Sequence, residues 1–201
     1  MDAIELLKHD HRMVEQLFRD YRAAASARQR RAVVETVVRE LSKHAAVEEL
    51  LVYPLARKVL PDGQQEIDEH LSEHMGVKQT LLALDKLPTA DWHSETYPDG
   101  HRGGEGDEQV FEETDRLMDE LRLEIEVHVA EEEGGLMPKL REAVDQQTLD
   151  ELGRELEKAK RAAPSRPHPN APDQPPALAM AAPVAGVYDR LRDRLQGRPR
   201  T

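Results

Sequence analysis

Histidines and glutamates on what should be the buried faces of helices constrain the fold of this 201-residue sequence more than any other feature. Apolar residues recur three and four positions apart in four long segments, and this spacing predicts helices over roughly 2–26, 29–59, 64–87 and 108–142. Each apolar stripe is interrupted by polar residues, which are His11, His44, Glu48, His70, His74, His128 and Glu132. Because an unpaired buried carboxylate is costly, the pattern predicts a four-helix bundle with a polar site inside it.

Six of these seven residues form pairs four positions apart, which are His44/Glu48, His70/His74 and His128/Glu132. Side chains at this spacing lie on one helix face, so both members of a pair can reach the same point. Neutral imidazole and carboxylate are ligands of iron, zinc, copper and manganese. A single pair is more often an ordinary core or surface feature, whereas three pairs on three helices favour a metal site. Seven ligands exceed what one ion takes from a protein, so we expect two ions with bridging carboxylates.

One phrase occurs twice, as "HAAVEELLVYP" from His44 and as "HVAEEEGGLMP" from His128. Two earlier segments, "DHRMVEQLF" and "EHMGVKQTL", also match, since both read acid-His-x-x-Val-x-Gln. Two helix pairs therefore repeat one hairpin, which predicts an approximate twofold axis between the two metals. The glutamate five positions after each histidine lies one position off the stripe, so we expect Glu49 and Glu133 behind the ligands or in solvent. The proline that ends each phrase is expected to bend or relax the helix.

Composition divides the chain into three parts. Residues 1–161 form the predicted bundle, with a short fifth helix near 146–161; a Pro/Ala-rich stretch over 162–183 reads as an extended linker. Residues 184–201 form a basic amphipathic segment. A lid or gas-entry gate is one hypothesis for the polar loop over 88–107, and an ordinary solvated loop is the other; the candidate side chains are Trp92, His93, Tyr97 and His101.

The overall composition excludes several classes of function. Without cysteine, the chain has no disulfide, thiolate metal site or cysteine nucleophile. A net charge of −12 makes nucleic acid an unfavourable partner, because binding to nucleic acid requires basic groups that neutralise phosphates. No apolar run approaches the roughly 20 residues that span a bilayer, and nothing resembles a signal peptide. We therefore expect a cytoplasmic protein whose C-terminal helix docks back on the acidic bundle or is disordered, rather than binding a membrane.

The order His, HxxxE, HxxxH, HxxxE over residues 1–145 resembles the hemerythrin-like, or HHE cation-binding, family. The resemblance implies an up-down-up-down four-helix bundle with a non-haem di-iron centre, bridged as Fe–O–Fe or Fe–OH–Fe. It further implies that His70, His74 and His128 bind one iron, that His11 and His44 bind the other, and that both are bridged by Glu48 and Glu132. The second iron would then have an open position for dioxygen, nitric oxide or peroxide.

Two departures from related proteins restrict the expected function. Oxygen-carrying hemerythrins have HxxxxD where this chain has HxxxE, which puts classical oxygen transport in doubt. Ferritin-like proteins need Glu-x-x-His pairs, and none of the nine histidines here has Glu three residues before it. Binding or sensing of dioxygen, nitric oxide or peroxide is the first hypothesis. The alternatives are a peroxide-decomposing or nitric-oxide-reducing enzyme, and an iron storage or repair protein; the missing cysteine disfavours the last.

Overall fold

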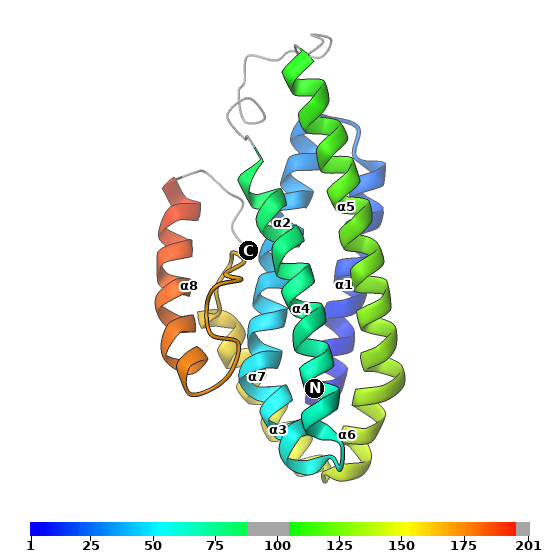
Figure 1. The fold of residues 1–201 in the computed structure, drawn as a ribbon, viewed down its shortest axis with the longest axis vertical. Coiled ribbons are helices and arrows are strands. Elements are labelled where there is room, and N and C mark those ends of the chain that lie inside the picture. Colours follow the sequence, from blue (N-terminus) through cyan, green and yellow to red (C-terminus); the bar gives the residue numbers. More distant parts are fainter. Residues whose placement is uncertain (88–104, 196–201) are drawn as a thin grey trace.

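The computed structural model describes residues 1–87 and 105–195, and within these residues it contains helices and no strand. Four long helices run along the long axis of the molecule (Figure 1), namely α1 (Ala3–Ala23), α2 (Ala27–Val47), α4 (Gly63–Lys86) and α5 (Glu105–Glu131). Helix α1 packs on α2, α4 packs on α5, and α2 also packs on α4. The predicted all-α bundle is confirmed. The candidate lid residues Trp92, His93, Tyr97 and His101 lie outside the described part of the chain.

Two of these helices contain a wide π-helical turn before they continue. Helix α2 runs through η1 (Glu48–Val52) into α3 (Tyr53–Val59), and α5 runs through η2 (Glu132–Leu136) into α6 (Met137–Ala143). Pro54 and Pro138 have no N–H and crowd the preceding turn, which disfavours the normal helical bond there. The Tyr53 amide donates instead to the Glu48 carbonyl five residues back, and the same bond forms in the second helix. The predicted relaxation therefore begins before each proline, at the glutamate itself.

The core consists of two apolar clusters, one on each side of the layer of polar residues. On α1, Leu7 belongs to the first cluster and Val14 to the second, and His11 lies between them in sequence. On α4, Ile67 and Leu81 are divided in the same way. The interruptions seen in the sequence thus fall at one level of the bundle, where apolar layers above and below exclude water.

The chain after the bundle packs against it. Helix α7 (Gln146–Ala162) is the predicted fifth helix, and residues 163–167 are buried rather than extended in solvent. Helix α8 (Ala177–Leu195) begins seven residues before the expected boundary at 184 and lies beside the bundle in Figure 1. The Arg166 guanidinium explains the packing, because it donates to Asp85 of α4 at 2.8 and 2.9 Å.

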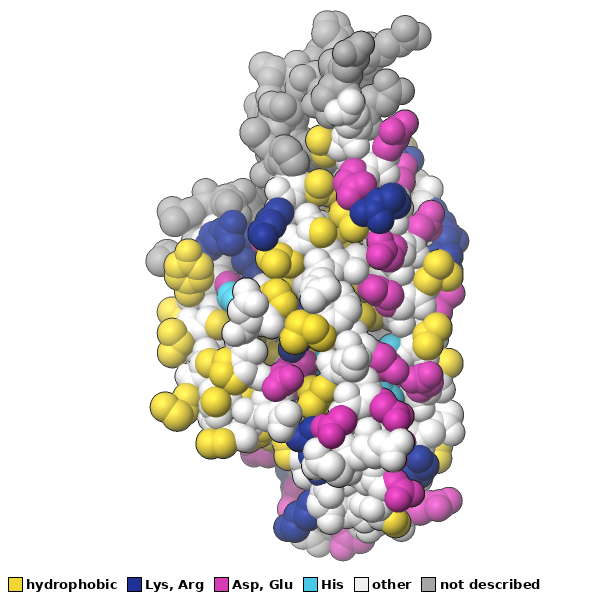
Figure 2. Space-filling model, in the orientation of Figure 1, with side chains coloured by type: hydrophobic (Ala, Val, Ile, Leu, Met, Phe, Trp, Pro, Cys, Tyr) yellow, Lys and Arg dark blue, Asp and Glu magenta, His cyan; other side chains and the backbone are white. Residues whose placement is uncertain are grey.

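Acidic residues of α8 contact the preceding segment, and Arg190 of α8 donates to the Arg161 carbonyl oxygen of α7 at 3.3 Å. Asp193 accepts from Arg166 at 2.9 Å, and Asp189 lies 2.9 Å from His168. Large apolar side chains of α8 are exposed on its outer face (Figure 2), namely Met180, Val184, Val187 and Tyr188. Within the described residues, no helix is both long enough and apolar enough to cross a membrane.

Candidate metal centre

The structure brings all seven predicted ligands together. Four helices supply the histidines, and Glu48 and Glu132 are each the first residue of a π-helical turn. Every one of the seven residues is buried, with at most 5% of its surface exposed. The sequence pattern had placed them on the inner faces of their own helices, and the fold aligns those faces at one level.

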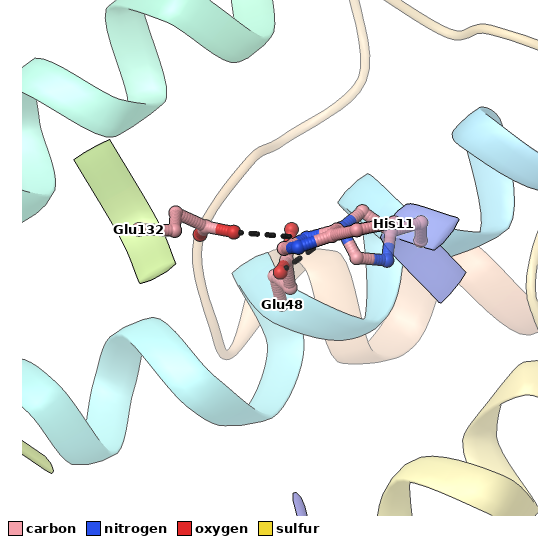
Figure 3. A group of neighbouring side chains, drawn as sticks. His11, Glu48 and Glu132 are labelled. Carbon is pink, nitrogen blue, oxygen red and sulfur yellow. Dashed lines mark ion pairs between the residues drawn. The ribbon is translucent and has the colours of Figure 1, made fainter. Parts of the chain in front are cut away.

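The imidazole Nε2 atoms converge on the two carboxylates. Glu48 lies 3.1 Å from His44 Nε2 and 3.4 Å from His74 Nε2. Glu132 lies 3.4 Å from His11 Nε2, toward which it points in Figure 3, and 3.5 Å from His128 Nε2. Three groups that contain Glu48 or Glu132 have ligand atoms within 4.8 Å of one another, which are His11/His44/Glu48/Glu132, Glu48/His74/His128 and His70/His128/Glu132. Each carboxylate therefore belongs to two groups. A fourth group, His70/Glu73/Glu131, contains neither of these glutamates.

Several of these buried atoms make no hydrogen bond, which is unusual for polar atoms away from water. They are His11 Nε2, His44 Nε2, both carboxylate oxygens of Glu48 and one oxygen of Glu132. Each carboxylate oxygen has lone pairs, and each imidazole Nε2 has one when it carries no hydrogen. All of these atoms face the same space. Imidazole nitrogen with carboxylate oxygen is a donor set that suits iron, and a cation would satisfy every one of these atoms. The residues present therefore fit the iron that the family pattern implies.

A carboxylate lies on the Nδ1 side of the ring in each of the five candidate ligand histidines. The contacts are His11 with Glu133 at 2.8 Å, His44 with Asp10 at 3.3 Å, His74 with Glu49 at 3.0 Å, and His128 and His70 with Glu73 at 2.8 and 3.3 Å. An Nδ1–H that donates to a carboxylate leaves the Nε2 lone pair free for a metal. The outer carboxylates thus fix the tautomer and direction of each ring.

Two of these outer carboxylates were missed by the sequence reasoning, although the signal was present. Asp10 and Glu73 are the acids of the repeated acid-His phrase. Each one crosses to the neighbouring helix, Asp10 to His44 and Glu73 to His128. Glu49 was expected behind the ligands or in solvent, and the structure places it behind His74. The repeat therefore extends to the partners of the ligands.

The electrostatics of the metal-free site follow from these contacts. Burial lowers the pKa of His44, but the charge of Glu48 and the contact with Asp10 outweigh it and raise that pKa to about 10. Burial likewise lowers the pKa of His74, and contacts with Glu48 and Glu49 raise it to about 9. Burial raises the pKa of Glu48, yet His44 and His74 hold it well below the usual range. Protonated imidazoles thus balance the buried carboxylate, and a metal cation would take their place.

Tyr53 is a further member of the site that the sequence did not reveal. Its buried hydroxyl donates to Glu132 Oε1 at 3.2 Å and lies 3.0 Å from His74 Nε2. Burial and the neighbouring charge of Glu132 hold the pKa of the phenol well above its usual value. Tyr53 follows directly after the π-helical turn, so the wide turn sets the direction in which its ring points.

A helical bundle that encloses histidines and glutamates in this way is a metal-binding protein. The family model described as "Hemerythrin HHE cation binding domain" matches residues 2–99. An uncharacterized hemerythrin-like protein of Schizosaccharomyces pombe is 25% identical over 191 residues, which covers 94% of this chain and 84% of the relative. No solved structure matches the chain. The predicted resemblance to the hemerythrin-like family is therefore confirmed over residues 2–99. The match ends before His128 and Glu132, which the fold brings to the other candidate ligands.

Proposed function

We propose that this chain is a non-haem di-iron protein that binds or senses dioxygen, nitric oxide or peroxide. The observation that carries the proposal is that Glu48 and Glu132 each belong to two groups of converging ligand atoms. This sharing supports two ions rather than one. His70, His74 and His128 would hold one ion, His11 and His44 the other, and the two glutamates both.

The residues of the chain would control the centre in three ways. The outer carboxylates orient the imidazoles, so that Nε2 faces the ions. The apolar layers above and below the polar residues would keep bulk water away from a bound small molecule. The two carboxylates balance part of the cationic charge. Bound iron would supply electrons and an open coordination position for a small ligand.

A peroxide-decomposing oxidoreductase is the second candidate function, and Tyr53 favours it. Decomposition of peroxide requires a proton to move to a departing oxygen. The Tyr53 hydroxyl, already within 3.2 Å of Glu132 Oε1, is a proton donor at the ligand set. We expect Tyr53→Phe to slow peroxide consumption without loss of iron if the protein has this activity.

The visible spectrum of the iron-loaded protein tests these functions against each other. We expect a stable, reversible band with dioxygen or nitric oxide for a binding protein. Rapid gas evolution from peroxide with retained iron would instead establish the enzyme. Loss of iron from the protein when the iron is oxidised and then reduced would instead indicate iron storage or delivery. Small ligands are the proposed partners; a cytoplasmic location and the absence of a nucleic-acid partner remain predictions from the sequence.

The ligand assignment is tested by a matched pair of variants on α1. His11 is buried and His9, two positions away, is exposed. We expect His11→Ala to lower the bound iron below two per chain and His9→Ala to leave it unchanged. Glu132→Ala should lower it further, because this residue would contact both ions. Equal iron content in all three variants, with helix content intact, would refute the assignment.

A further inference from the structure

Lysines contact three of the outer carboxylates. Lys160 Nζ lies 2.6 and 2.7 Å from the two oxygens of Asp10. Lys78 Nζ lies 2.6 Å from Glu49, and Lys8 Nζ lies 3.5 Å from Glu133. Lys160 differs from the other two because it comes from α7, which is outside the four helices that supply the ligands.

Lys160 occupies a position of α7 where an apolar residue would be expected. The buried stripe of this helix runs through Leu149, Gly153 and Leu156, and Lys160 is the next residue at the same spacing. Gly153 permits a close approach to the start of α1, because a Cβ there would lie 2.7 Å from the Met1 carbonyl oxygen. This contact fixes the register of α7 on α1 and brings the Lys160 ammonium to Asp10.

We propose that Lys160 is a positioning residue of the metal centre, which acts through Asp10 on His44. The ammonium contacts both oxygens of Asp10, and one of these oxygens also lies 3.3 Å from His44 Nδ1. With this cation in place, Asp10 keeps its direction and accepts from Nδ1–H, so His44 offers Nε2 to the metal. The inference rests on the proposed function only in that His44 is a ligand.

The surroundings of this ion pair separate it from an ordinary surface salt bridge. Asp10 is 3% exposed, so the charge of its carboxylate is not screened by solvent. By contrast, Lys158 on the same helix pairs with Glu155 at 3.5 Å, and both side chains are more than half exposed. An exposed pair of this kind contributes little. Replacing a residue that orients a metal-ligating histidine typically lowers metal affinity by about 10- to 100-fold.

Iron affinity of full-length variants tests the proposal. Ferrous iron is titrated without oxygen, against a competing chelator, into the wild type, Lys160→Met, Lys160→Arg and the control Lys158→Met. We expect Lys160→Met to weaken binding of one of the two equivalents by about 10- to 100-fold. Lys160→Arg, which keeps the charge, should restore most of this loss, and Lys158→Met should match the wild type. Equal affinities in Lys160→Met and Lys158→Met would overturn the proposal.

A second measurement uses the metal-free protein and separates this inference from the proposed function. The ring ¹⁵N resonances of His44 report whether each nitrogen carries hydrogen and how the ring is hydrogen-bonded. We expect Lys160→Met to change these resonances and to leave those of His74 unchanged, with helix content intact. Wild-type protein that takes up no iron would refute the di-iron function, while the His44 resonances would still test the role of Lys160. Unchanged His44 resonances, or a general loss of helix content, would show that Lys160 is structural only.

Discussion

If His44 and His74 are metal ligands as proposed, their raised pKa values should make metal uptake depend steeply on pH. In the metal-free protein these values are about 10 for His44 and about 9 for His74, so both rings are protonated between pH 6.5 and 8. A metal needs the Nε2 lone pair, and each ring must therefore lose one proton on binding. The Glu48 pKa lies well below this range, so that carboxylate releases none. Two protons per centre correspond to an affinity that rises about 100-fold per pH unit.

Calorimetry measures this proton release directly. Iron is titrated without oxygen in buffers of different ionisation enthalpy, and the slope of heat against buffer enthalpy gives the number of protons. We expect about two at pH 7 from these two rings. Glu49→Gln should reduce the number at pH 8, because Glu49 helps to raise the pKa of His74. Proton release near zero at pH 6.5 to 8 would refute the reasoning, since the imidazoles would then be neutral before metal binds.

Stability measurements check three further consequences. Because the pKa of His44 is raised to about 10, its protonated ring stabilises the metal-free protein. This contribution is complete below pH 6.5 and is lost as the pH rises to about 10, so the Tm should fall over this range without metal. A constant Tm would contradict this. Gly153→Ala should lower the Tm by about 2 to 12 °C through a backbone clash, with Gly134→Ala, which meets open space, as the neutral control. Arg166→Leu removes the cation that neutralises buried Asp85 and should cost about 3–5 kcal/mol in urea unfolding; a loss below 1 would contradict the ion-pair assignment.

The candidate ligands could be proposed from the sequence because helical periodicity specifies one face of a helix. His11 rather than His9 lies on the apolar stripe of α1, and Glu48 rather than Glu49 lies on the stripe that continues from α2 into η1. The structure brings the predicted residues together, as their spacing required. Periodicity does not specify which side chain a neighbouring helix places opposite, and for this reason the contact between Asp10 and His44 was not foreseen.

The packing of the C-terminal part of the chain was also not predictable from local sequence patterns. A stretch rich in proline and alanine reads as an extended linker because it lacks a helical pattern. In the structure the buried Arg166 joins this stretch to the bundle through Asp85, and His168 lies 2.9 Å from Asp189 of α8. Such ion pairs join segments far apart in the chain, so no local pattern reveals them.

The sequence by itself therefore determined the bundle, the level of its polar layer and the seven candidate ligands, because all of these follow from the spacing of residues along single helices. Only the tertiary structure decided what surrounds those ligands. Pro54 widens the helix and turns Tyr53 toward Glu132, and the register of α7 places Lys160 at Asp10. The physical reason is that the candidate ligands repeat a local pattern, whereas their partners depend on how separate helices pack.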